Sequence, residues 1–405
     1  MRKYLIMFFI ILYQSNAGAS IKLQTENSSF LSENSSVSIL TCGKSSKFLY
    51  SLFGHSAIRI KDAKKQIDLV CNYGTFDNDD PEFYINFING RMKYSLSVSD
   101  YSAFLQEYII NGQPVSSQKL NLTLKERNKL FLLISEEVKP ANRFYDYDFV
   151  QHNCATKIRD LLAKTIGSDF EHSLSALHKG KGNTVREMVS DYLTGDEFYL
   201  FGMNALLGKK ADVISSKAIS LFLPDTLAKR LDHIQLRNVK LSEPAVFLFN
   251  PADQVAPSDP KLANLNNTIL YGLSFILLTA ALLIKKKPAF FTKLITFITI
   301  AVFAVISLAG CLLIYLSVFS SLELVKYNLN ILWCHPLYLL LFFKKLHKAT
   351  AIIFLAGILL FMGLDFKTIS FAVTFPVLLL LVILISLSFN DDASARNQMK
   401  RIDLV

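Results

Sequence analysis

The segment Tyr145–Asp160 reads YDYDFVQHNCATKIRD and changes at Cys154 from an aromatic, extended pattern to a helical one. Ile158, Leu161, Leu162 and Thr165 then recur at helical spacing on the side of the cysteine. Asn153 is a natural N-cap for this helix. Because a thiol in the first helical turn feels the positive end of the helix dipole, its pKa falls toward that of a nucleophilic thiolate. The segment therefore predicts a reactive thiol at Cys154.

The base that such a thiol needs is predicted at His55, in the segment LFGHSAIRI of residues 52–60. Strand alternation places His55, Ala57 and Arg59 on one face of this strand. Ser56, Ile58 and Ile60 lie on the opposite face. Gly54 permits a close approach of the backbone or of a substrate. After a polar turn, residues 67–73 form the returning strand of a hairpin. On that strand, Asn72 or Asp68 can orient the imidazole.

The chain order of base, polar group and thiol is typical of nucleophilic catalysis, in which a third group fixes the tautomer of the imidazole. Each residue alone is more often structural, because a lone histidine on a strand is usually satisfied within the fold and a cysteine at a helix start is usually buried and inert. Together, Cys154, His55 and Asn72 form the predicted catalytic set. The sequence contains no zinc spacing and no phosphate-binding glycine loop, so we expect neither a metal nor a cofactor.

The chain has 405 residues, of which 51% are hydrophobic, and its mean hydropathy is above zero, which indicates a membrane protein. Residues 1–19 combine a basic start, a short apolar run and small residues at the end, as in a secretory signal peptide. Residues 20–263 are expected to form an exported α+β domain that ends in a proline-containing linker. Residues 264–390 are expected to form a helical membrane domain, and residues 391–405 a cytoplasmic tail.

Five apolar runs predict about five transmembrane helices, at residues 268–284, 294–316, 329–343, 350–364 and 368–388. The third run is interrupted at Trp333–Pro336, so four or six spans remain open. Basic residues cluster in alternate loops and in the tail, and such clusters stay in the cytoplasm. The N-terminal domain is therefore expected on the side of the membrane opposite the cytoplasm. The formal net charge of +10 is partly a signal of this topology and requires no nucleic acid.

Three further features of the chain allow two interpretations each. Arg91 and Arg159 can hold a phosphate, because a planar guanidinium suits such an anion, but a surface ion pair is the plainer interpretation of each. The aromatic stretch at residues 81–88 can line an acyl groove or belong to the core. Cys42 and Cys71 either form a disulfide across neighbouring strands or are small buried residues.

Short motifs in this chain resemble those of known families. GHSAI at residues 54–58 and Asn-Cys at residues 153–154 resemble a circularly permuted papain-like branch, which includes NlpC-type hydrolases and lecithin:retinol acyltransferase. Five motifs in one order look more closely like the periplasmic domain of the Lnb-type bacterial lipoprotein N-acyltransferases. They are LTCG (40–43), YSLFGHSAIRI (50–60), NYGTF (72–76), FINGRMKY (87–94) and NCATKIRD (153–160).

The resemblance implies a permuted papain-like fold, with an antiparallel sheet plus helices, and a thiol enzyme at the inner membrane. It further implies acyl transfer from a phospholipid donor to a lipoprotein acceptor, with His55 and Cys154 at the matching positions. One alternative is a membrane-tethered cysteine peptidase or amidase acting on the cell wall, because the same pair cleaves amides when water is the acceptor. Another is a sensor that binds lipid or peptide without catalysis. Five membrane runs exceed what a wall hydrolase needs for anchoring, which favours a lipid substrate.

Overall fold

The chain folds as two compact units. The first comprises Met1–Asn183 and Ile214–Pro257, and the second comprises Thr184–Val213 and Ser258–Val405. A computed structural model describes residues 30–45, 47, 51–76, 81–176, 182–214, 221–251, 289–343, 345–365 and 379–382. The predicted signal peptide and most of the predicted linker lie outside the described residues.

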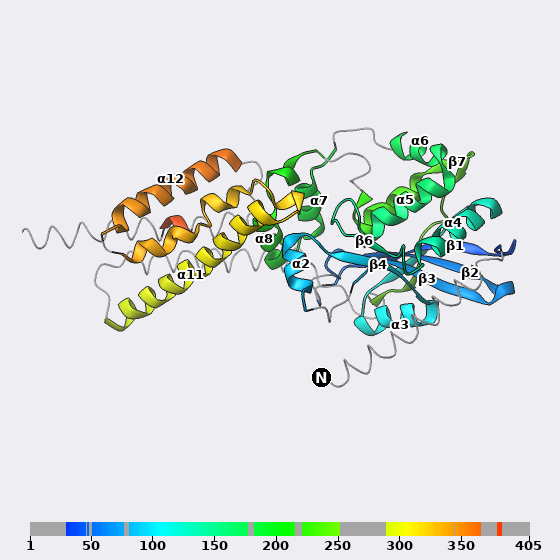
Figure 1. Cartoon of the computed structure of the whole chain (residues 1–405), viewed down its shortest axis with the longest axis horizontal. Coiled ribbons are helices and arrows are strands. Elements are labelled where there is room, and N and C mark those ends of the chain that lie inside the picture. The colour runs from blue at the N-terminus through cyan, green and yellow to red at the C-terminus, as the bar shows by residue number, and fades with distance from the viewer. Residues whose placement is uncertain are drawn as a thin grey trace, which may run out of the picture. The chain divides into compact units, whose positions relative to one another are not determined.

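A seven-stranded sheet forms the centre of the first unit, and all its neighbouring strands are antiparallel (Figure 1). The strands lie in the order β6-β4-β3-β2-β1-β5-β9. Their bounds are Ser36–Cys42 (β1), His55–Asp62 (β2), Ile67–Thr75 (β3), Lys93–Asp100 (β4), Val115–Lys119 (β5), Phe144–Asp146 (β6) and Val246–Phe249 (β9). The α+β class predicted for the exported region is confirmed, whereas the permuted papain-like topology stays a prediction.

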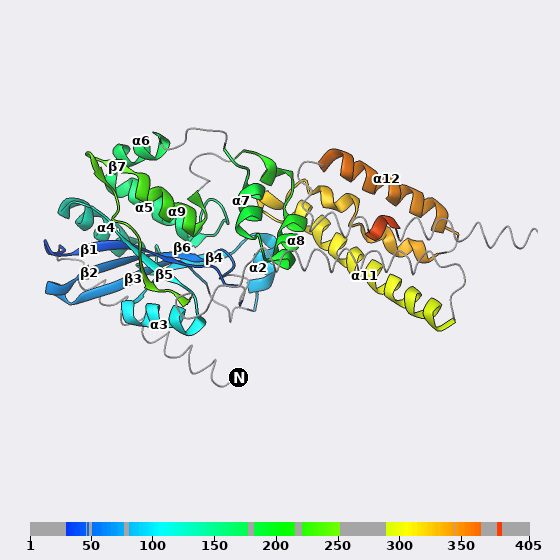
Figure 2. The ribbon, with the colours of Figure 1, turned by 180° about the vertical axis from the view of Figure 1, so that it is seen from behind.

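Helices cover both faces of the sheet (Figure 2). One face packs against α4 (Leu124–Glu137), α5 (Cys154–Ile166), α6 (Ser168–Ala176) and α9 (Pro224–His233). The other packs against α3 (Tyr101–Asn111). The four residues predicted on the inner side of α5 are all buried, and each of the three aliphatic side chains among them contributes about 1.5–3 kcal/mol through burial. The start of α5 is thereby held against the sheet.

The hairpin predicted from the sequence is formed by β2 and β3. On β2, Ile58 and Ile60 face the larger core, whereas Ala57 faces the core beneath α3. On β3, Cys71 and Val70 alternate in the same way. The predicted faces are confirmed, and the same alternation assigns His55 and Asn72 to the face of α3.

Cys42 and Cys71 are both free and buried. They lie on β1 and β3, which are separated by β2, and they belong to the cores on opposite faces of the sheet. Strands two places apart are roughly 10 Å from each other, which is beyond the reach of a disulfide. Of the two interpretations left open by the sequence, the small buried residue is the correct one for both cysteines.

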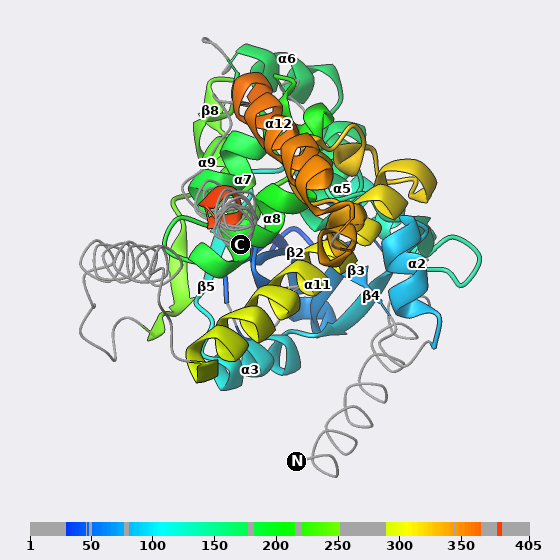
Figure 3. The same ribbon diagram turned by 90° about the vertical axis from the view of Figure 1, so that its left-hand side faces the viewer.

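The second unit contains α7 (Val185–Tyr192), α8 (Glu197–Leu206), α11 (Ala289–Phe319) and α12 (His347–Asp365) (Figure 3). Side chains of α11 and α12 belong to one hydrophobic cluster. Within α11, residues Ala301–Phe319 are long and apolar enough to cross a membrane. The shorter stretch Ala349–Leu364 of α12 is also apolar. These elements match the second and fourth predicted membrane runs.

The third predicted membrane run is not one continuous helix. It consists of two 3-10 segments, η8 (Leu329–Leu332) and η9 (Pro336–Phe342). The break falls at the predicted interruption, because Pro336 has no N–H with which to continue a helix. The first predicted run, residues 268–284, lies outside the described residues. The fifth run, residues 368–388, also lies outside them, except for residues 379–382. The count of five spans therefore stays a prediction.

Residues 184–213, which the sequence placed in the exported domain, pack within the second unit. Asn328 Nδ2 donates to the carbonyls of Ala205 and Leu206, at 2.8 and 3.0 Å. These carbonyls end α8 and have no partner inside the helix. The buried Arg186 pairs with Asp212 at 2.5 Å. The ion pair lies within this segment, and the hydrogen bonds of Asn328 join the segment to the chain between α11 and α12.

Candidate functional site

Helix α5 begins at Cys154 because Asn153 caps it, as predicted. Asn153 Oδ1 accepts the N–H of Thr156 at 3.0 Å, and Thr156 Oγ1 accepts the N–H of Asn153 at 2.9 Å. The amide group of Asn153 donates to the carbonyls of Phe149 and Phe222, at 2.8 Å each. These bonds fix the first turn of α5, so Cys154 lies at the positive end of the helix dipole.

His55 begins β2 and lies beside Asn72 of β3, with 3.2 Å between His55 Nε2 and Asn72 Oδ1. The imidazole also shares a hydrogen bond with the thiol of Cys154. Gly54 has a φ of 70°, and a Cβ there would lie 2.4 Å from the carbonyl oxygen of Cys42. Only glycine suits this turn into β2. The structure thus brings together the three residues that the sequence grouped.

Asp68, the other polar residue considered for orienting the imidazole, is engaged elsewhere. Its two carboxylate oxygens accept hydrogen bonds from the guanidinium of Arg59, at 2.7 Å each. The guanidinium carbon of Arg59 also lies 3.3 Å from the ring centroid of Tyr101. A bidentate pair of this kind has a fixed geometry. Asn72 is therefore the polar residue of β3 that contacts His55.

The pKa of the Cys154 thiol is lowered from its ordinary value. Burial raises this pKa, but the charge of His55, the hydrogen bond from His55, and the N–H groups of Ser56 and Ala155 lower it more. For His55, burial lowers the pKa, while the Cys154 thiolate and the bond to Asn72 raise it more, so its pKa is raised. The pair favours a thiolate beside an imidazolium, the state in which a cysteine is nucleophilic.

Glu107 of α3 also acts on the site and was missed in the sequence. This half-buried carboxyl lies close enough to His55 for its charge to help raise the pKa of the imidazole. Burial raises the pKa of Glu107, and the charge of His55 lowers it by less. The motif segments do not include α3, and only the packing of this helix under the sheet brings Glu107 near the histidine. No sequence signal pointed to it.

The two arginines considered for phosphate binding differ in their surroundings. Arg91 is exposed just after α2 (Phe83–Asn89). Arg159 forms an ion pair with Asp160, with 2.7 Å between Nη2 and Oδ1. This contact is the plainer interpretation that the sequence allowed for Arg159. A role in phosphate binding stays a prediction for both residues.

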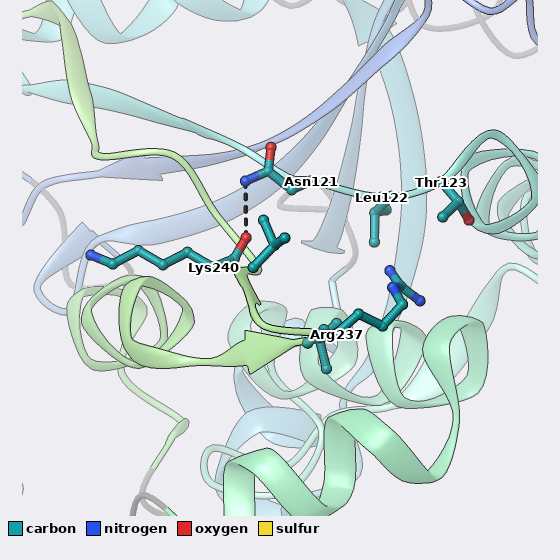
Figure 4. Close-up of a pocket in the computed structure, with 7 residues that line it drawn as sticks. Asn121, Leu122, Thr123, Arg237 and Lys240 are labelled. Carbon is teal, nitrogen blue, oxygen red and sulfur yellow. Dashed lines mark hydrogen bonds between the residues drawn. The ribbon is translucent and has the colours of Figure 1, made fainter.

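A pocket of about 400 Å³ lies elsewhere in the first unit, between the start of α4 and the hairpin of β7 (Gln235–Leu236) and β8 (Val239–Lys240) (Figure 4). In it, Asn121 Nδ2 donates to the carbonyl of Lys240 at 2.9 Å. Arg237 also lines the pocket and pairs with Glu126. None of the predicted catalytic residues lines this pocket. Among the described residues, no group of three or more His, Cys, Asp or Glu side chains is placed to hold a metal ion.

Two family models match the chain. The Lnb N-terminal periplasmic domain matches residues 27–190, and the Lnb transmembrane domain matches residues 265–391. The chain belongs to the Lnb family. The first match includes Cys154, His55 and Asn72, and the second includes both α11 and α12. No curated protein and no solved structure matches the chain.

Membership of the Lnb family makes the chain a membrane protein with a periplasmic domain. The resemblance carried by the five sequence motifs is confirmed, since all of them fall within the match to the periplasmic domain. The thiol and imidazole lie in that domain.

Proposed function

We propose that this protein is a lipoprotein N-acyltransferase of the bacterial inner membrane. The observation that carries the proposal is the Cys154–His55–Asn72 arrangement, in which a thiol of lowered pKa starts a helix and contacts an imidazole of raised pKa. This arrangement lies in the periplasmic domain of an Lnb-family chain that also has a transmembrane domain. A thiol nucleophile with its base suits acyl transfer.

In the first half-reaction, the Cys154 thiolate attacks the ester carbonyl of a phospholipid. A C–S bond forms, the C–O bond to the glycerol breaks, and the His55 imidazolium gives its proton to the leaving oxygen. The products are a lysophospholipid and an acyl-thioester on Cys154. The backbone N–H of Cys154, together with a neighbouring amide, is suited to stabilise the oxyanion that forms on the carbonyl.

In the second half-reaction, the α-amino group of a lipoprotein's lipid-modified N-terminal cysteine attacks the thioester. A C–N bond forms, the C–S bond breaks, and the neutral imidazole of His55 takes the proton from the amine. Cys154 is released as a thiolate beside an imidazolium, ready for another donor. Asn72 is a positioning residue, because its Oδ1 accepts the N–H of His55 Nε2 and leaves the other ring nitrogen for the thiol.

The membrane domain suits this reaction because both substrates are held in a bilayer. An enzyme anchored in the same membrane meets them at a high effective concentration. In this proposal the chain is a multi-pass protein of about five spans with residues 20–263 in the periplasm. Residues 1–19 direct export, residues 264–390 hold the domain at the membrane, and residues 391–405 lie in the cytoplasm. No metal or cofactor takes part.

Transfer is tested with the full-length protein in detergent, a phospholipid donor and a synthetic diacylated lipopeptide. The mass of the lipopeptide is expected to rise by one acyl chain at its α-amine, since an amine is the acceptor in the second half-reaction. Cys311→Ser is the matched control, because Cys311 is a free, exposed cysteine on α11, and this variant should transfer normally. Release of free fatty acid without a gain in the mass of the lipopeptide, or cleavage of a cell-wall peptide, would show that the protein is a hydrolase and not a transferase.

A further inference from the structure

Five aromatic rings of the first unit form a continuous series, here called the aromatic row. The ring centroids of Tyr147 and Tyr94 are 4.2 Å apart, and those of Tyr94 and Phe76 are 5.0 Å apart. Phe76 and Phe83 follow at 5.2 Å, and Phe83 and Phe87 at 6.4 Å. Tyr147 directly follows β6, and from Tyr94 the row runs from β4 to α2, which lies next to that strand (Figure 1, Figure 2).

The aromatic row passes beside the nucleophile at Tyr94. Gly74 has a φ of 98° and lies in the irregularity of β3 between Tyr73 and Thr75. A Cβ built on Gly74 would be 3.9 Å from Cβ of Cys154 and 3.9 Å from Cδ2 of Tyr94. The thiol side chain and the ring of Tyr94 are therefore neighbours across a residue that has no side chain.

From Tyr94, the ring beside Cys154, exposure rises along the row toward Phe87, whereas Tyr147 on the other side of Tyr94 is half-buried. Tyr94 is only 8% exposed, Phe76 and Phe83 are half-buried, and Phe87 is 41% exposed. Ile85, also on α2, is 61% exposed. A row of core residues would end in buried side chains, whereas this one ends in apolar side chains that are open to solvent.

A second aromatic cluster lies near the thiol, but it leads to a buried ring and not to the surface. Phe53 and Phe149 are 5.0 Å apart between ring centroids, and Phe149 and Phe222 are 5.3 Å apart. This cluster ends at Phe222, which is 1% exposed and whose carbonyl holds Asn153. It supports the start of α5, and none of its three rings is exposed, since Phe53 and Phe149 are half-buried. Of the two clusters, the aromatic row is the one that leads from the thiol to the surface.

We propose that the aromatic row binds the acyl chain carried on Cys154, with the thioester at Gly74 and the chain running over Tyr94, Phe76 and Phe83 toward Phe87. This inference rests on the proposed function and adds the binding site of the chain. Apolar rings attract methylene groups without directional bonds, so the row holds a chain while its carbonyl stays at Cys154. Each methylene laid on the row adds to the affinity, which selects long-chain donors over short ones.

The site is tested by crosslinking with phospholipids that carry a diazirine at one of two positions of the transferred chain. After the thioester has formed on Cys154, irradiation and peptide mass spectrometry locate the attachment. A diazirine near the carbonyl is expected to mark Tyr94 or Phe76, and one near the chain end is expected to mark Phe83 or Phe87.

The outcomes separate this inference from the proposed function. A thioester on Cys154 with attachments at Phe149 or Phe222, or outside the first unit, overturns the aromatic row and leaves the transferase standing. The absence of a thioester on Cys154 with either lipid overturns both. Attachments that move along the row with the position of the diazirine support both.

Variants distinguish chain binding from a structural role of the same rings. Phe83→Ala and Phe87→Ala are each expected to slow acylation of Cys154 by a long-chain phospholipid about tenfold, the size of effect that missing apolar contacts have in a pocket. Acylation by the short ester p-nitrophenyl acetate should be unchanged. Phe144→Ala is the matched control, since Phe144 is a 52% exposed phenylalanine outside the row. An equal loss with both esters would assign the rings to folding and overturn the inference.

Discussion

Replacing Cys154 with serine, or His55 with alanine, is expected to lower acyl transfer to a lipopeptide by about 10⁴-fold or more, because nucleophile and base act as one unit. The oxygen of serine is not ionised by a neighbouring imidazole, and without His55 the thiol loses the main cause of its lowered pKa. Both proteins should fold, because both side chains are only partly buried. The measurement is the rate of mass gain of the lipopeptide, with circular dichroism as a check on folding.

The third residue is expected to behave differently. Asn72→Ala removes one hydrogen bond to a charged group, which is worth about 1.5–3 kcal/mol, so the rate should fall by about ten- to a hundredfold and not vanish. His152→Ala is the matched control, because His152 is an exposed histidine two residues before the nucleophile. Full activity in Cys154→Ser would rule out the thiol mechanism. Full activity in His55→Ala combined with loss in His152→Ala would show that His152, and not His55, is the base.

The second large effect is expected in the pH dependence of alkylation. Because the pKa of Cys154 is lowered, its thiolate persists below the ordinary thiol pKa of 9.0, and iodoacetamide should modify it rapidly at neutral pH. The rate should fall only as the pH drops through that lowered pKa. In His55→Ala the charge that lowers the pKa is gone, so the midpoint should move to higher pH and neutral alkylation should slow. Peptide mass spectrometry measures the modified fraction over time.

Cys71 provides an internal comparison in the same experiment. Burial raises the pKa of Cys71 to about 12, and the side chain is inaccessible, so this cysteine should stay unmodified at neutral pH. A midpoint for Cys154 at or above that of an ordinary thiol would contradict the ion pair with His55. An unchanged midpoint in His55→Ala would show that other groups lower the pKa.

The parts of the site that the sequence predicted are those set by local rules. Capping preference predicts the N-cap at Asn153, and the helical period of apolar residues predicts the helix that starts at Cys154. The alternating period of a strand predicts the hairpin that carries His55 and Asn72. The alternation along β2 also assigned His55 to its face correctly. The choice between Asn72 and Asp68 needed the structure, because only there is Asp68 paired with Arg59.

Other parts depend on packing between distant segments, which a single sequence does not encode locally. Glu107 reaches the region of His55 because α3 packs under the sheet. The aromatic stretch at residues 81–88 allowed either a groove or a core, and the stacking of Phe83 on Phe76 appears only in the fold. In the membrane region, Pro336 signalled a break but not that the segments on both sides of it would be 3-10 helical.

The central claim is that Cys154 carries the acyl chain between donor and acceptor. The most direct measurement is the intact mass of the purified protein after incubation with phospholipid alone. We predict a gain of one acyl chain that maps to Cys154 and is removed by hydroxylamine, which cleaves thioesters. An unchanged protein mass under conditions in which the lipopeptide is still acylated, or an equal gain in Cys154→Ala, would contradict the account.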